Sequence, residues 1–205
     1  MDIVYFDPYP NTKLEAFITA YGSLLKSHGE RPITITRVPT VEEVLTKSDV
    51  VSLHCNLDEN TKHLIDAKKL KLMRPDAVLV NAARGPVIDE RALVAHLKSN
   101  PDFRCGLDVF EDEPLMAPGL AECPNAVIVP HIASASLWTR GGMATLAAAN
   151  VAGRLRGAPV WGSPDDILAF VDGAYEAVPV ASPSIVNAGD LGIPKLEAAK
   201  KKAAA

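Results

Sequence analysis

The sequence has few cysteines and no long apolar run, and both shortages exclude classes of protein. Cys55, Cys105 and Cys123 are the only cysteines among 205 residues. They are too few and too scattered for a disulfide framework, so they indicate a reducing compartment. No C-x-x-C or H-x-x-x-H spacing occurs, so we expect no metal site. No apolar run approaches the roughly 20 residues of a membrane-spanning helix, so we expect no membrane partner.

Charge of one sign is not in large excess, and targeting signals are missing. A net charge of −4 gives no electrostatic reason to expect nucleic acid as a partner. The first residues lack the layout of a secretory signal or a transit peptide, and the chain ends in Ala-Ala-Ala instead of a peroxisomal Ser-Lys-Leu. With 48% hydrophobic and 22% charged residues, the composition is that of a soluble globular protein, in the cytoplasm or an organelle matrix.

Short apolar runs alternate with amphipathic stretches along most of the chain. Because neighbouring parallel strands need a crossover that is usually a helix, this alternation predicts an α/β fold with a doubly wound, Rossmann-like parallel sheet. The predicted strands are 2–6, 33–36, 49–54, 77–80, 103–109 and 126–129. The predicted helices are 11–26, 40–47, 66–73, 89–99 and 136–156.

The glycine-rich turn of a dinucleotide fold is also missing. Such folds place G-x-G-x-x-G after the first strand and an acidic residue about 20 residues further on. Asp7 stands where that acidic residue belongs, and no glycine loop precedes it. We therefore expect a partial NAD-binding domain, 1–157, that begins at the second strand. An irregular tail, 158–205, would pack on a substrate domain outside this chain, with about the last ten residues disordered.

Three of the predicted strands end in side chains that could form one site: a guanidinium, a carboxylate and an imidazole. Arg84 follows strand 77–80, Glu113 follows strand 103–109, and His131 follows strand 126–129. Ligands of open α/β sheets bind at the carboxyl ends of the strands. There a guanidinium could clamp a carboxylate and stabilise developing negative charge. An imidazole could donate a proton, and a carboxylate could orient its ring.

Each of these residues also has an ordinary interpretation when it is taken alone. Arg84 and Glu113 could be solvated loop charges, and His131 could be a histidine that is satisfied at a strand end. Asp7, which precedes a proline, could be a turn residue. Their order along the chain is what favours a common site.

The motifs N-A-A-R-G, D-V-F-E-D-E-P and P-H-I resemble, in this order, the D-isomer-specific 2-hydroxyacid dehydrogenases. The resemblance implies that Arg84 binds substrate and that Glu113 and His131 form an acid/base pair in an NAD-dependent oxidoreductase. Residues 132–148 and 181–187 are similar to the plant-type hydroxypyruvate reductases of that family. This likeness implies reduction of hydroxypyruvate to D-glycerate, with glyoxylate as a secondary substrate.

The resemblance also implies positions that bind NAD. The stretch S-L-H-C-N-L-D-E-N-T is similar to the family loop S-L-H-x-P-L-x-x-x-T, although Asn56 stands where proline is usual. Asp7 would accept hydrogen bonds from the adenine ribose and repel a 2′-phosphate, which favours NAD over NADP. The implied cofactor-binding residues are Asp7, His54, Cys55, Thr61, Ala82, Ala83, Asp108 and Ser134.

Several alternatives stay open. The substrate could be phosphoglycerate, glyoxylate or D-lactate, or the chain could be an inactive fragment. It could also be a non-catalytic NAD-sensing module, since transcriptional corepressors share this fold and its catalytic triad. The expected partners are a small 2-keto or 2-hydroxy acid and, for the full-length protein, a second copy in a homodimer. Without the glycine-rich loop, the chain alone should bind NADH poorly.

Overall fold

The computed structural model describes residues 1–155, 190 and 192. The chain divides into two compact units, Met1–Ala133 and Ser134–Ala205. The described part of the second unit contains helix α5 (Leu137–Leu155), which confirms the predicted helix 136–156. The predicted boundary at residue 157 and nearly all of the predicted tail lie outside the described residues.

Strands alternate with helices throughout the first unit, and every strand pair in it is parallel. The predicted α/β class is therefore confirmed. The strands are β1 (Asp2–Tyr5), β2 (Thr34–Arg37), β3 (Val50–Leu53), β4 (Val78–Asn81), β5 (Arg104–Leu107) and β6 (Ala126–Ile128). The helices are α1 (Thr12–Ser27), α2 (Val41–Lys47), α3 (Ala67–Leu70), the short 3₁₀ helix η1 (Gly85–Val87) and α4 (Glu90–Ser99).

The helices begin where the sequence supplies a capping side chain. Asn11, Thr40 and Asp89 each accept a hydrogen bond from the backbone N–H three residues further on. Helix α3 is shorter than predicted: it ends at Leu70 instead of residue 73.

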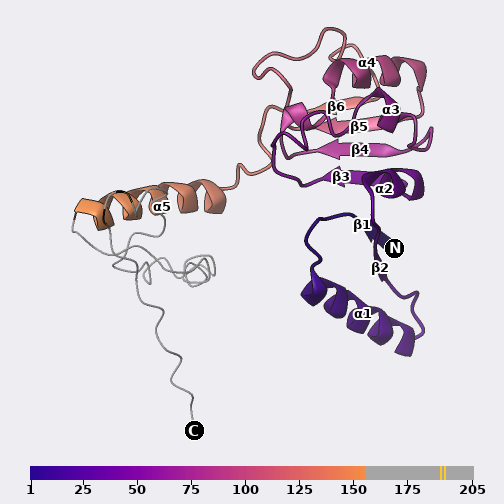
Figure 1. Cartoon of the computed structure of the whole chain (residues 1–205), viewed down its shortest axis with the longest axis horizontal. Coiled ribbons are helices and arrows are strands. Elements are labelled where there is room, and N and C mark those ends of the chain that lie inside the picture. Colours follow the sequence, from indigo (N-terminus) through magenta and orange to yellow (C-terminus); the bar gives the residue numbers. More distant parts are fainter. Residues whose placement is uncertain (156–189, 191, 193–205) are drawn as a thin grey trace. The chain divides into compact units, whose positions relative to one another are not determined.

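Hydrogen bonding divides the strands into two sheets instead of the single sheet that we expected. One sheet has the order β1-β2 and the other has the order β3-β4-β5-β6, and Figure 1 shows the two sets apart. In a doubly wound sheet the usual strand order is 3-2-1-4-5-6. If β1 is counted as the second strand, the observed order agrees, and the first strand would lie between β1 and β3. No strand among the described residues occupies that position.

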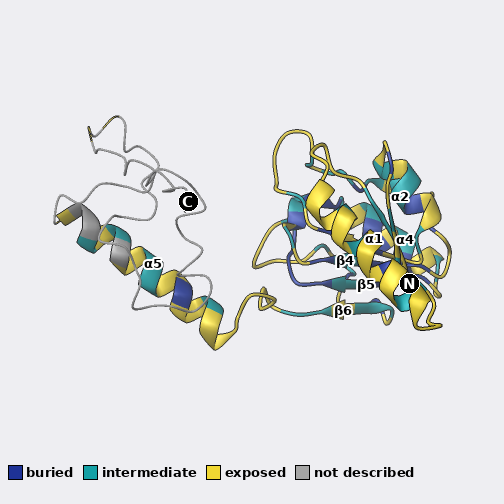
Figure 2. Cartoon of the chain, turned by 90° about the horizontal axis from the view of Figure 1, so that it is seen from below, coloured by how far each residue is buried: buried dark blue, intermediate teal, exposed yellow. Residues whose placement is uncertain are grey.

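The apolar core lies around the four-stranded sheet. Its largest fully buried side chains come from α2, β4, η1 and α4, from the segment 65–70 and from the loops on either side of β5, and Figure 2 shows buried positions in β4, β5 and α4. They include Leu45, Ile65, Leu79, Leu93 and Phe103. In α1, by contrast, only Gly22 is buried. No described helix is long and apolar enough to cross a membrane.

The sheet register brings the carboxyl ends of β3 to β6 to one edge. Leu53 pairs with Asn81, Asn81 with Leu107, and Leu107 with Ile128. The loops that follow these strands therefore start side by side. Three of these loops carry Arg84, Glu113 and His131.

Candidate active site

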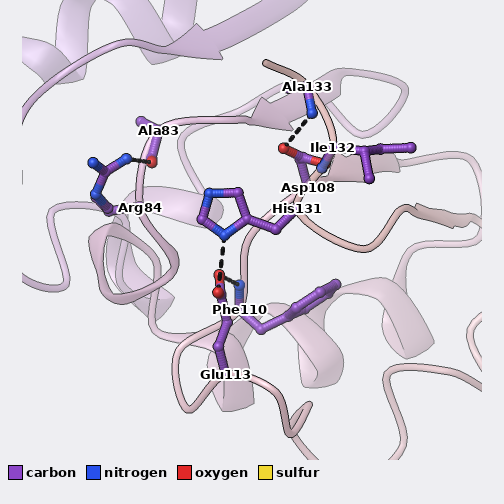
Figure 3. A network of polar contacts seen from close by, with 8 residues as sticks. All are labelled: Ala83, Arg84, Asp108, Phe110, Glu113, His131, Ile132 and Ala133. Carbon is purple, nitrogen blue, oxygen red and sulfur yellow. Dashed lines mark hydrogen bonds and ion pairs between the residues drawn. The ribbon is translucent and has the colours of Figure 1, made fainter. Parts of the chain in front are cut away.

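His131 has a left-handed backbone conformation, with φ of 51°. Residues other than glycine seldom adopt this conformation, which costs about 1–3 kcal/mol. The N–H of His131 donates to the carbonyl of Asp108 (2.9 Å). Both oxygens of the buried Asp108 carboxylate accept backbone N–H groups, from Ile132 (2.6 Å) and Ala133 (2.9 Å). Asp108 therefore fixes the turn that presents the imidazole (Figure 3).

Glu113 and His131 form a hydrogen-bonded pair. The Nδ1 atom of His131 lies 2.9 Å from Oε2 of Glu113, and Oε1 of Glu113 accepts the Phe110 N–H at 3.2 Å. The hydrogen bond from His131, the bond from Phe110 and the charge of His131 together hold the pKa of Glu113 below its ordinary value. The Nε2 atom of His131 has no hydrogen-bond partner among the described residues. It can therefore reach a ligand.

Arg84 stands in a turn that the buried amide of Asn81 shapes. Asn81 Oδ1 accepts the Ala83 N–H (3.0 Å), and Nδ2 donates to the Arg84 carbonyl (2.9 Å). The exposed Arg84 guanidinium donates from Nη1 to the Ala83 carbonyl (2.6 Å). It makes no ion pair with any described residue. Most of its donors are thus left for an anion.

A pocket of about 410 Å³ lies between the loops that follow β3 and β4. This volume suits a small ligand or one part of a larger one. Its lining includes five positions that the sequence predicted for cofactor or substrate. The lining residues are His54, Cys55, Asn56, Leu57, Ala82, Ala83 and Arg84.

The loop after β3 is held by its own side chains. Thr61 Oγ1 donates to the Asn56 carbonyl (2.6 Å) and accepts the Asp58 N–H (2.8 Å). This closure fixes the backbone at Asn56 without the proline that is usual there. His54 Nε2 lies 2.9 Å from Ser52 Oγ. Burial raises the pKa of the Cys55 thiol, so this pocket residue is a neutral thiol near neutral pH.

Three predicted cofactor residues of the first unit, Asp7, Thr61 and Asp108, do not line the pocket. The carboxylate of Asp7, after β1, accepts the Tyr9 N–H at 2.7 Å, which is the local bond of a turn. The Arg37 guanidinium holds the Asp7 carbonyl at 2.8 Å. Ser134 is the first residue of the second unit, and its carbonyl accepts the Ser136 N–H (3.0 Å).

Comparison with known proteins identifies the family. The pattern described as "D-isomer specific 2-hydroxyacid dehydrogenase, NAD binding domain" matches residues 1–133, which is more than half of the chain. The chain belongs to this family. The matched region is the NAD-binding domain of the family, and NAD is its cofactor.

Two plant dehydrogenases are similar over almost the whole chain. "Glycerate dehydrogenase" of Cucumis sativus is 58% identical over 192 residues, which are 94% of this chain and 50% of that protein. "Glycerate dehydrogenase HPR, peroxisomal" of Arabidopsis thaliana is 56% identical over 194 residues, 95% of this chain and 50% of that protein. The chain thus spans about half the length of these curated relatives.

Two solved structures share the fold. The holo form of D-mandelate dehydrogenase from Rhodotorula graminis has a TM-score of 0.61 and 34% identity, over 78% of this chain and 42% of that chain. The TT0316 protein of Thermus thermophilus has a TM-score of 0.61 and 35% identity, over 77% and 44% of the two chains.

The sequence alone did not single out every residue that shapes this candidate site. Asn81 was not predicted, although an asparagine between a buried strand and a turn is a known signal for side-chain to backbone bonding. The side chains of Glu90 and Glu111 also accept backbone N–H groups from segments far away in the sequence. No local sequence pattern indicates these bonds. For Asp108, both oxygens already accept backbone N–H groups. Its predicted contact with nicotinamide stays a prediction, which the second lone pair of each oxygen permits.

The described residues fit one end of NAD better than the other. The pocket beside Arg84 has the size and the position, at the carboxyl ends of the strands, that suit a nicotinamide ring with a small substrate. Pyrophosphate normally binds at a glycine-rich turn before a helix, and the described residues contain no such turn. Among the described residues, no group of three or more His, Cys, Asp or Glu could hold a metal ion.

Proposed function

We propose that this chain is the catalytic, NAD-binding part of an NADH-dependent hydroxypyruvate reductase, which forms D-glycerate and also reduces glyoxylate to glycolate. The observation that carries the proposal is the pair formed by His131 and Glu113 at the strand ends that also present Arg84. The printed names of the two plant relatives support the choice of substrate. When bound, NADH supplies the hydride.

In this proposal His131 donates the proton that the keto oxygen acquires. Its Nδ1 atom is bonded to Glu113, so the ring is held in one orientation and Nε2 faces the substrate. General-acid catalysis of this kind contributes about 10²- to 10⁴-fold to a rate.

Arg84 would bind the substrate carboxylate. A planar guanidinium can make two parallel hydrogen bonds to a carboxylate, and that of Arg84 has no carboxylate partner among the described residues. Its positive charge would also stabilise the negative charge that develops on the keto oxygen. Asn81 supports this role because it fixes the turn that carries Arg84.

The substrate assignment can be tested with the protein at its full natural length. NADH oxidation would be followed by absorbance with hydroxypyruvate, glyoxylate, pyruvate and phosphohydroxypyruvate. We expect the highest kcat/KM with hydroxypyruvate and a lower value with glyoxylate. A higher kcat/KM with pyruvate or phosphohydroxypyruvate than with hydroxypyruvate would show that the proposed substrate is wrong.

The catalytic role of the imidazole can be tested with His131→Asn. Asparagine tolerates left-handed backbone, so this change removes the ring with little strain. We expect kcat to fall by about 10²-fold or more. The control is His28→Asn, at the exposed end of α1, which should leave kcat unchanged. A loss of less than tenfold in His131→Asn would exclude general-acid catalysis by this imidazole.

We also propose that the full-length protein is a homodimer in the cytoplasm or in an organelle matrix. The Arabidopsis relative is named as peroxisomal, whereas the present sequence ends in Ala-Ala-Ala. Imaging of the tagged natural protein, with the tag placed at its N-terminus, would give the compartment. Light scattering of the purified protein would give its mass, and a monomeric mass would exclude the dimer.

A further inference from the structure

The segment that carries Glu113 makes little backbone pairing of its own. It follows β5, and the bridge between Asp112 and Leu115 is an isolated one. Its position must therefore come from contacts with other parts of the fold. The same segment contains Glu111, two residues before Glu113.

Glu90 and Glu111 bind each other reciprocally. The Glu90 N–H donates to Oε2 of Glu111 (3.2 Å), and the Glu111 N–H donates to Oε2 of Glu90 (2.7 Å). The other oxygen of Glu90 accepts the Ala117 N–H (2.7 Å). Glu90 is only 4% exposed and is the first residue of α4, where the N-terminal end of the helix favours a negative charge. The segment is thus hydrogen-bonded to the start of α4 at two residues, Glu111 and Ala117.

Close backbone packing fixes a third point. A side chain at Gly85 would collide with the carbonyl of Phe110, so η1 and the start of the segment lie in direct contact. Phe110 supplies the N–H that Glu113 accepts. Its position therefore bears directly on the carboxylate of Glu113.

His63 forms a second histidine–glutamate pair with this segment. Its Nε2 atom lies 2.6 Å from Oε1 of Glu111, and the two side chains are 38% and 26% exposed. The backbone of His63 is left-handed, with φ of 51°, and its N–H donates to the Pro86 carbonyl (2.7 Å). Thr61, which closes the pocket loop, is two residues away. His63 thus links the pocket loop to the segment of Glu113.

We propose that His63 and Glu111 are positioning residues that set the geometry of the Glu113–His131 pair. Glu111 is fixed between His63 and the start of α4, and it directly follows Phe110, whose N–H holds Glu113 in place beside His131. This inference rests on the proposed function for its catalytic consequence, but the positioning itself can be measured without turnover. The charged or titratable groups that contact Glu111 are His63 and Glu90.

The test compares variants of the natural full-length protein. His63→Gly removes the side chain and keeps the left-handed backbone free of strain, and Glu111→Gln keeps the shape and removes the charge. We expect kcat with hydroxypyruvate to fall about tenfold in both, because the hydrogen bond between His63 and the Glu111 carboxylate is lost in the first variant and weakened in the second. KM should change less than twofold. His63→Asn, which tolerates this backbone and retains a donor, should recover part of the loss.

The matched control is Asp112→Asn, which removes a neighbouring charge from the same segment. The exposed Asp112 side chain has no hydrogen bond or ion pair in the described structure, so its kcat should equal that of the natural protein. The stability of each variant would be followed by thermal unfolding. If His63→Gly does not fold, Glu111→Gln decides the outcome.

The readout that separates positioning from simple stabilisation is the titration of Glu113 by carboxyl carbon NMR. In His63→Gly and Glu111→Gln the pKa of Glu113 should rise toward its ordinary value, because its hydrogen bonds to Phe110 and His131 weaken. An unchanged Glu113 titration, or an unchanged kcat in an active enzyme, would overturn the proposal. If the natural protein reduces none of the keto acids, the proposed function fails, while this titration still decides the positioning.

Discussion

Residues 1–37 and residues 38–133 share one alternation of strands and helices but bury very different amounts of apolar side chain. In the second region Leu79, Leu93 and Phe103 are fully buried. In the first region no hydrophobic side chain is buried, and α1 leaves Phe17 65% exposed. Local signals such as the Asn11 cap specify a helix, whereas a core needs neighbouring elements on both sides. The region with fewer described neighbours therefore has secondary structure and little core.

The two regions also differ in the roles that we propose for their residues. Arg84, Glu113 and His131 all follow strands of the packed region, where a rigid sheet can hold them in register. Only Asp7 belongs to the first region. We therefore expect mutations in the two regions to differ in kind as well as in size.

The largest expected effect is on stability. Phe103→Ala should lower the free energy of unfolding by about 3–5 kcal/mol, because it leaves a cavity beneath the four-stranded sheet. Phe17→Ala, on the exposed side of α1, should change it by no more than about 0.5 kcal/mol. Urea unfolding followed by circular dichroism would measure both. Similar losses would mean that α1 is packed in the protein in solution, and the contrast between the regions would disappear.

A smaller effect is expected on cofactor choice. Asp7→Asn keeps the oxygen that accepts the Tyr9 N–H but removes the charge that would repel a 2′-phosphate. We expect the preference for NADH over NADPH to narrow about tenfold, as for the loss of one interaction with a charged group. Titration of the natural protein with both nucleotides would measure it. Glu30→Gln, at an exposed position of the same region, serves as the control, and an equal change there would exclude a specific role for Asp7.

The smallest effect concerns acid stability. The pKa of Glu113 is held low chiefly by the hydrogen bond from His131, and the pKa of Asp2 chiefly by the hydroxyl of Thr34. A carboxyl whose folded pKa is depressed stabilises the folded state above its unfolded pKa of about 4, and this stabilisation is lost as the pH falls through the folded pKa.

Replacing either carboxyl should therefore reduce the fall in melting temperature between pH 7 and pH 3. We expect a difference of about 1–3 °C for Glu113→Gln and less for the exposed Asp2→Asn. Differential scanning calorimetry at the two pH values would show it. A larger fall in Glu113→Gln than in the natural protein would contradict the sign of the pKa shift.

The sequence predicted most helices and strands because their signals are local. Asn11 and the Thr40–Glu43 capping box mark helix starts, and the apolar run 77–80 marks β4. The division into two sheets was not predicted, because it depends on which strand lies beside which. That information involves residues far apart in the sequence.

The sequence was enough to propose the catalytic residues of the candidate site, but not the residues that hold them in place. Arg84, Glu113 and His131 could be named because each follows an apolar run that ends abruptly. The left-handed backbone of His131 and its clamp by Asp108 could not be read from the sequence, since histidine has no strong preference for that conformation. Nor could the link between His63 and Glu111, which joins loops 48 residues apart.

The separation of the two sheets has a consequence for handling the protein. The edges of β1 and β3 that face the interval between the sheets carry rows of backbone N–H and C=O groups that no described strand takes up. Such edges act as templates for strands of other molecules and promote aggregation. We expect the mean particle mass of the isolated chain, measured by light scattering, to rise with concentration. A peptide that forms a parallel strand on one of these edges should suppress this rise.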